Sequence, residues 1–305
     1  MLTFFRNEFL EQPVGMKKSL LVILAFALFS SGCSTAMLAY RNADWYLQHK
    51  INGYTTFNAA QKVTIRQQVS DYMQWHRKEA LPEYIIFLQN LNGTAQTDGR
   101  LTAEQIALLR AHLMNLYKKT LEPAIRPTAQ LLSSLDNRQI QELGRTFAEQ
   151  NQKLKKEVLN SSHDDILNKR ADETLSFLDW LAGKLSKEQT QKIREMSRRL
   201  PLASEIYMQH REANQGRLIA LLNEHAGAER IAAFLSSWIL TPEATRTSQQ
   251  QRVIQAFETG SDEMIVQIHG LLTAKQKAHM HKTISSLIDD MKGLATDMRA
   301  QAAHP

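Results

Sequence analysis

The ten residues from Trp75 to Tyr84, WHRKEALPEY, hold the densest group of chemically versatile side chains in this sequence. On a helix, His76 and Glu79 stand three residues apart and could hydrogen-bond. An indole, an imidazole, a guanidinium and a carboxylate together could bind an anionic or glycan ligand. The alternative is a polar network that pins a kinked helix, because Pro82 removes a backbone donor. The candidate site consists of Trp75, His76, Arg77 and Glu79, which Arg41 and Asp44 could join from the first helix.

Familiar catalytic and metal-binding patterns do not occur in the sequence. None of the ten histidines has a glutamate three residues before it or a histidine four residues away, which excludes the helical di-iron and zinc-protease patterns. His279 and His281 are two apart and diverge on a helix. No Walker A loop, Gly-x-Gly-x-x-Gly or Gly-x-Ser-x-Gly elbow is found. We therefore expect no catalytic residue, no bound metal and no cofactor, and a protein that is not an enzyme.

The single cysteine, Cys33, follows the only long apolar run, residues 19–29. That run of 11 residues is too short to span a bilayer comfortably but suits the core of a signal peptide, and Lys17 and Lys18 precede it. Met16 could be the true start, or a longer leader from Met1 is discarded with the rest. We expect a signal peptide over 1–32.

The residues around Cys33 resemble the bacterial lipobox, in which a small residue precedes a cysteine that is acylated after cleavage. Ser30 departs from the usual leucine at the third position before the cysteine. Plain secretion and an uncleaved anchor stay open, because Ser30 and Gly32 also suit an ordinary signal peptidase. Several acyl chains would anchor the protein stably. Ser34 is not the aspartate that retains such lipoproteins in the inner membrane, so we expect the outer membrane, facing the periplasm.

The mature chain should fold as a basic, all-helical protein. The formal net charge is +6, and 43% of the residues are hydrophobic, so the chain can bury a core. Only 12 glycines and 7 prolines occur, which favours helices over a many-stranded sheet. Basic residues are scattered among acidic ones, which is typical of a solvated helical surface. In the envelope the chain would not meet nucleic acid. The membrane and an envelope protein are the expected partners.

Five helix starts share one design: an apolar residue, an acceptor at the N-cap and a glutamine three residues later, as in a capping box. Their irregular spacing argues against a strict solenoid. Breaks in the pattern occur at 92–99 and at Gly260-Ser261, among other points, and Pro123 and Pro127 should kink or restart a helix. The five pairs of cap and glutamine are Asn58 and Gln61, Thr102 and Gln105, Asp136 and Gln139, Ser186 and Gln189, and Thr273 and Gln276.

The last helix carries an apolar seam that needs a partner surface. Packing within the chain and docking of another protein are both open. The seam consists of Met280, Ile284, Leu287, Met291 and Leu294. We predict an elongated bundle of about eight to ten helices without a sheet. It forms one helical domain over 36–300, tethered by residues 33–35, and a subdivision near 200–225 stays open. Tyr40, Trp45 and Tyr46 are expected in or near the core, or alternatively at lipid headgroups.

Three pieces of the sequence resemble a family of uncharacterised proteobacterial lipoproteins known only as a domain of unknown function. They are the stretch 38–45, the stretch 75–84, and Leu200-Pro201 followed by Arg211, Gln215 and Leu218. The resemblance implies a helical envelope lipoprotein and brings no activity. We therefore expect a tethered binding or scaffold protein.

A weaker resemblance concerns the LTxxQ pattern at 101–105 and 272–276. This pattern is similar to that of small periplasmic stress chaperones, and helix capping explains the same letters. The resemblance implies the alternative function, a periplasmic chaperone that binds unfolded or partner proteins.

Overall fold

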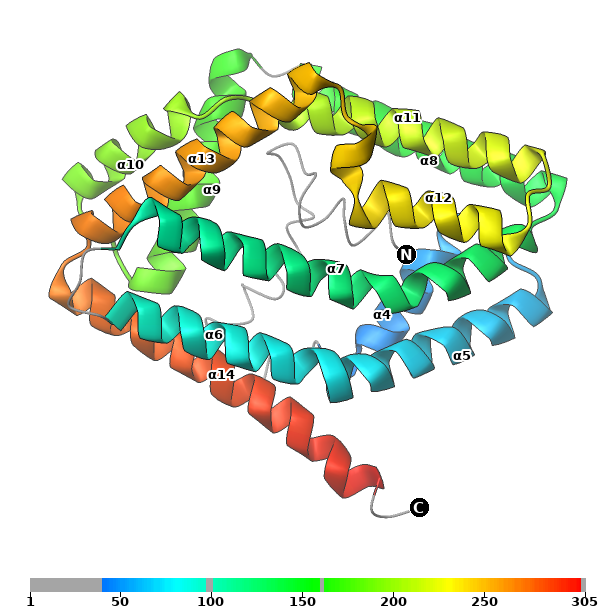
Figure 1. Cartoon of the computed structure of the whole chain (residues 1–305), viewed down its shortest axis with the longest axis horizontal. Helices are drawn as coiled ribbons and strands as arrows, with labels where there is room; N and C mark the ends of the chain where they lie inside the picture. The colour runs from blue at the N-terminus through cyan, green and yellow to red at the C-terminus, as the bar shows by residue number, and fades with distance from the viewer. Residues whose placement is uncertain (1–39, 97–100, 160–161, 303–305) are drawn as a thin grey trace. The chain divides into compact units, whose positions relative to one another are not determined.

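The computed structural model describes residues 40–96, 101–159 and 162–302. Cys33, the predicted signal peptide and the tether lie outside these residues. The described chain contains helices and no strand, so the all-helical prediction is confirmed. In chain order the elements are α4 (Ala43–Asn52), α5 (Ala59–Trp75), the π-helix η2 (His76–Ala80), α6 (Leu81–Gln96), α7 (Ala103–Ser133), α8 (Asn137–Leu159), α9 (His163–Ala182), α10 (Lys187–Arg199), α11 (Ser204–Asn223), α12 (Ala228–Leu240), the 3₁₀-helix η3 (Pro242–Thr245), α13 (Ser248–Leu271) and α14 (Ala274–Ala302) (Figure 1).

All five predicted capping boxes form, and each helix begins one residue after its cap. At α5, for example, the Gln61 backbone N–H donates to Asn58 Oδ1 over 2.9 Å, and the Asn58 N–H donates to Gln61 Oε1 over 3.0 Å. The capping box therefore located the starts of α5, α7, α8, α10 and α14 from sequence alone.

The predicted break at Gly260-Ser261 is wrong, and the predicted break at 92–99 begins later than expected, because tertiary contacts carry each helix further. α6 continues past Asn92, whose side chain bonds Ser285 Oγ over 3.2 Å and His281 Nδ1 over 2.8 Å on α14. α13 continues through Gly260, where a Cβ atom would lie 2.8 Å from Leu200 Cδ2. This glycine lets a neighbouring side chain approach the helix closely and does not end it. α7 likewise runs through Pro123 and Pro127 without ending.

The chain divides into two compact units, and each takes segments from both halves of the sequence. Unit 1 contains the described residues up to His76, Tyr117–Asn160 and Ser204–Ser248, and unit 2 contains Arg77–Leu116, Ser161–Ala203 and the described residues from Gln249. One boundary falls inside the π-helix and another inside α7. The prediction of a single helical domain over 36–300, with a possible subdivision near 200–225, stays a prediction.

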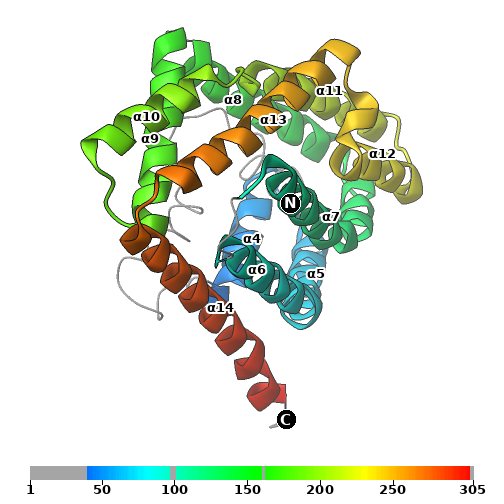
Figure 2. The ribbon, with the colours of Figure 1, turned by 60° about the vertical axis from the view of Figure 1, so that its left-hand side comes forward.

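Each unit has its own apolar core. The core of unit 1 gathers buried side chains from α4, α5, α7, α8, α11 and α12, and its largest fully buried side chain is Trp238. The core of unit 2 gathers α9, α10, α13 and α14, with Ile193 fully buried. Figures 1 and 2 show α8 beside α11 in unit 1, and α14 beside α6 in unit 2.

The glutamines of the capping boxes pair across each core. In unit 1, Gln61 and Gln139 donate to each other's side-chain oxygens over 3.1 and 2.7 Å. In unit 2, Gln189 and Gln276 do the same over 2.8 and 3.0 Å. All four are buried.

The backbone contacts of these glutamines show that the two units share one plan. Each glutamine also donates to the carbonyl two residues before its partner's N-cap. The accepting residues are Ser134 for Gln61, Thr56 for Gln139, Leu271 for Gln189 and Lys184 for Gln276. The starts of α5 and α8 in unit 1 are therefore paired in the same way as the starts of α10 and α14 in unit 2.

Candidate functional site

The imidazole of His76 is held by aromatic side chains. Its Nδ1 lies 2.6 Å from the hydroxyl of Tyr40, a helical residue just before α4. The rings of Tyr40, Tyr72 and Trp75 have centroids 5.7, 6.1 and 6.4 Å from that of His76. Tyr72 is itself fixed, since its hydroxyl donates to the Thr120 carbonyl over 3.1 Å. The contacts join the residues just before α4 to the end of α5.

The predicted bond between His76 and Glu79 does not form. Residues 76–80 are a π-helix, which changes the alignment of side chains three apart. Glu79 instead lies 3.8 Å from Lys78 Nζ. Tyr40, which lies just before α4 and was not among the predicted site residues, bonds His76. The geometry favours the alternative in which this stretch pins a helix at an irregular turn.

Trp45 was expected in or near the core, and this expectation is wrong. It is 66% exposed on α4, and its ring stacks on His49 with centroids 5.4 Å apart. One turn away, Lys50 Nζ lies 5.3 Å from the centroid of the half-buried Tyr46. This face of α4 presents aromatic rings and basic groups, while Leu47 and Ile51 face the core.

The apolar seam of α14 is mostly used inside unit 2. Met280, Ile284 and Leu294 are buried, together with Ile288, which the seam prediction had omitted. Leu287 and Met291 stay half-buried. Met280, Ile284 and Ile288 belong to the core that α6 and α9 help to form. Packing within the chain therefore accounts for the buried part of the seam, and docking of another protein on the rest stays a prediction.

A buried polar network joins α8 and α11 in unit 1, and the sequence analysis had not identified it as a site. Arg211 is 9% exposed and donates to Asn151 Oδ1 over 3.0 Å and to Gln150 Oε1 over 3.1 Å. The Asn151 amide donates to Gln215 Oε1 over 2.7 Å. Asn214 is 1% exposed. The hint available from sequence was the pair Arg211 and Gln215, polar residues four apart on one helix face.

Two buried atoms here have no hydrogen-bond partner among the described residues: Gln215 Nε2 of this network, and Oδ1 of the neighbouring Asn214, whose amide donates to the His210 carbonyl. Buried polar groups are normally paired, with protein or with ordered water. A water molecule is the simplest partner for both atoms. The network can therefore specify how α8 and α11 pack, and it contains no arrangement that suits catalysis.

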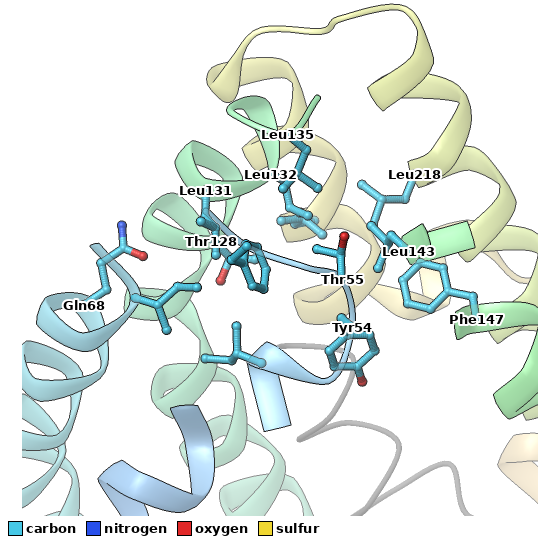
Figure 3. Close-up of a pocket in the computed structure, with 14 residues that line it drawn as sticks. Tyr54, Thr55, Gln68, Thr128, Leu131, Leu132, Leu135, Leu143, Phe147 and Leu218 are labelled. Atoms are coloured by element: carbon cyan, nitrogen blue, oxygen red, sulfur yellow. The ribbon is translucent and has the colours of Figure 1, made fainter. Parts of the chain in front are cut away.

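The apolar cavity of unit 1 is too small for a ligand of useful size. It has a volume of about 70 Å³ and is lined by residues such as Leu131, Leu143 and Leu218. Figure 3 shows these side chains approaching from α7, α8 and α11, with Phe147 beside Leu143. A dry cavity of about 150 Å³ is the scale that holds benzene. This space is a packing defect of the core.

A polar pocket of about 300 Å³ lies at the loop before α5, between Asn52–Thr56 and the first turns of α8. Its Glu142 carboxylate accepts from the Thr56 N–H over 2.8 Å and from the Thr55 hydroxyl over 2.9 Å. The Thr56 bond and, second, the Thr55 bond lower the pKa of Glu142. Because this carboxylate already anchors the loop, it is poorly placed to act on a ligand.

Within the described ranges, no three His, Cys, Asp or Glu side chains come together as a metal site. Of the helices that the structure describes, none combines the length and hydropathy that a membrane span requires.

The sequence matches the profile of a family described as "Family of unknown function (DUF6279)" over residues 53–243. The stretch 75–84 and the buried Arg211 and Gln215 lie inside the matched region. No curated protein and no solved structure matches the chain.

Proposed function

We propose that this chain, which belongs to the family of unknown function, is a lipid-anchored binding or scaffold protein of the bacterial envelope. Cys33 carries the lipid, and the helical part faces the periplasm from the outer membrane. The proposal includes no catalytic step and no cofactor. The observation that carries it is the lipobox-like context of Cys33 directly behind a short apolar run.

The start of the described chain supports a position close to the membrane. Cys33 and Tyr40 are seven residues apart, which an extended chain spans in at most about 25 Å. The exposed Trp45 stands at the beginning of α4, with Lys50 one turn further on. Aromatic rings beside basic groups suit the headgroup region of a bilayer.

The decisive experiment replaces Cys33 by alanine in the full chain expressed in a Gram-negative host. Metabolic labelling with an alkynyl fatty acid should mark the wild-type chain and leave Cys33→Ala unmarked. The mature variant should move to the soluble periplasmic fraction. A Trp45→Ala variant serves as the matched control, because it should keep the label and the membrane fraction. Acylation of the Cys33→Ala chain would refute the proposal.

A second candidate function, binding of unfolded protein, is favoured by exposed apolar side chains of unit 2. Leu108 is 72% and Leu113 is 40% exposed on α7, and Ile86 is 51% exposed on α6. Surface leucines of this kind can contact unfolded clients. The wild-type chain should then suppress aggregation of a denatured test protein, and Leu108→Ser should weaken this activity. If the wild type and Leu108→Ser suppress aggregation equally, α7 is not the surface that binds unfolded protein.

A further inference from the structure

Unit 2 contains an open pocket of about 680 Å³, within the range of small-ligand sites. It is bounded by one face of α10, the last turns of α13, the first turn of α14 and Leu101. The lining mixes hydrocarbon with charge. The apolar part consists of Leu101, Met196, Val266 and Leu271, and the titratable part consists of Lys192, Glu195, Arg199, His269 and Lys277.

The charged part of the lining is predominantly basic. Lys192, Arg199 and Lys277 face a single acid, Glu195. Lys192 Nζ already pairs with Glu188 over 2.7 Å outside the pocket. For Arg199 and Lys277, no carboxylate lies within salt-bridge distance in the part of the chain that the structure describes. Their charges are available to an anion.

Unit 1 has the same arrangement of paired glutamines without these cations, so the fold of the unit does not require them. Counting from the paired glutamines, Gln189 corresponds to Gln61 and Gln276 to Gln139. The residue after Gln139 is Ile140, which is 2% exposed, whereas the residue after Gln276 is the half-buried Lys277. The remaining basic positions 192, 199 and 269 correspond to Thr64, Asp71 and Leu132.

His269 adds a polar atom without a partner at the pocket wall. Its Nε2 is buried and has no hydrogen bond within the described ranges. Burial is the main reason that the pKa of His269 is lowered, and the charge of Lys277 lowers it further. An anion in the pocket would offset the charge of Lys277, and a protonated Nε2 could then donate to it.

We propose that this pocket binds a phosphoryl group attached to a partly apolar molecule. Because Lys192 is already paired with Glu188, Arg199 and Lys277 against Glu195 leave an excess of about one positive charge, which favours an anionic ligand. Arginine and lysine together suit phosphate oxygens. The hydrocarbon of Met196, Val266 and Leu271 would cover the carbon part of the ligand.

The test is lysine footprinting of the full-length chain in a nonionic detergent. Acetic anhydride modifies exposed amines, and mass spectrometry measures the modification of each lysine. Inorganic phosphate and glycerol phosphate are the soluble probes. The membrane probe is the chain in phosphatidylcholine nanodiscs with or without phosphatidic acid. Lys277 should become protected in a saturable manner, and Lys275 on the same helix is its internal control.

Two charge-removing variants localise the effect. Arg199→Gln should weaken the apparent affinity about tenfold, as expected for one lost charged hydrogen bond. Lys187→Gln, also on α10 but outside the pocket lining, should leave the affinity unchanged. Circular dichroism checks that both variants keep the helical fold.

The source of the phosphoryl group follows from which probe acts. Protection by soluble phosphates supports a free ligand, and protection only in nanodiscs with phosphatidic acid supports a lipid headgroup. The proposal is overturned if no probe protects Lys277, if Lys275 is protected equally, or if chloride at the same ionic strength has the same effect. Because the soluble arm needs no lipid anchor, its result does not depend on the acylation of Cys33.

Discussion

At the scale of single residues, glutamine is the side chain that organises this protein. Each buried glutamine caps its own helix and bonds a second helix, so it acts locally and across the core at once. Gln105 has the same local role at α7, yet it is exposed and pairs with no other glutamine in the described chain. Sequence alone could not separate these cases, because the local capping pattern is the same.

The first prediction concerns the coupling between Gln61 and Gln139. Either Gln→Met variant leaves a buried amide without its partner and should lower the free energy of unfolding by about 2–3 kcal/mol. The double variant should lose about 1–2 kcal/mol less than the sum, since neither amide is then orphaned. Urea denaturation measures all four chains of this cycle.

Gln105→Met is the matched control for this cycle. It removes a similar capping contact at an exposed helix start and should cost at most about 1 kcal/mol. A cost equal to that of Gln61→Met would show that the capping bond alone, and not the pairing, stabilises these helix starts.

The second prediction is a dependence of stability on pH through His269. Its pKa is lowered in the folded chain, chiefly by burial and then by Lys277. Between the folded pKa and the higher unfolded pKa, the unfolded chain holds more protons, so stability falls as the pH drops through this range. The neutral variant His269→Gln should therefore lose less stability than the wild type between neutral and mildly acidic pH.

Lys277→Gln tests the cause of this shift. Without the neighbouring charge, the pKa of His269 should rise part of the way back, and the loss of stability in acid should become smaller. Thermal unfolding at a series of pH values measures both variants. An acid dependence of His269→Gln equal to that of the wild type would contradict the assignment.

At the scale of helices, the end of α10 has a tertiary partner. α10 stops before Pro201, and Arg170 of α9 caps its end from a distance. The guanidinium donates to the carbonyls of Leu200 over 2.8 Å, Pro201 over 3.0 Å, and Ser197. A cation at the negative end of a helix is favourable, and the planar group reaches several carbonyls at once.

The third prediction is that Arg170→Lys is not a conservative change. A lysine ammonium cannot replace all three bonds from one position, so we expect a loss of about 1–3 kcal/mol in the free energy of unfolding. Arg66→Lys, at an exposed position of α5, is the control and should change stability by less than about 0.5 kcal/mol. Chemical denaturation measures the free energy of unfolding of both variants. Equal losses for Arg170→Lys and Arg66→Lys would contradict the capping role of Arg170.

At the scale of the whole molecule, the open question is whether the two units unfold together. Each has its own core and its own glutamine pair, although α7 contributes residues to both. The fourth prediction is that Gln61→Met speeds amide hydrogen exchange mainly in α5 and α8, and that Gln189→Met does so mainly in α10 and α14. Equal acceleration in all helices would instead show that the two units unfold together, as the single domain predicted from sequence would.

The sequence by itself determined the helical class and the starts of five helices, because a cap and its glutamine lie within one turn of each other. It also selected Cys33, whose context is local, as the predicted anchor. Only the tertiary structure decided which glutamines pair, that Asn92 and Gly260 lie within helices, and that Tyr40 meets His76. These features depend on side chains far apart in the chain, whose approach no local pattern encodes. The basic pocket of unit 2 is also a feature that only the tertiary structure decided, since Arg199, His269 and Lys277 come from three different helices.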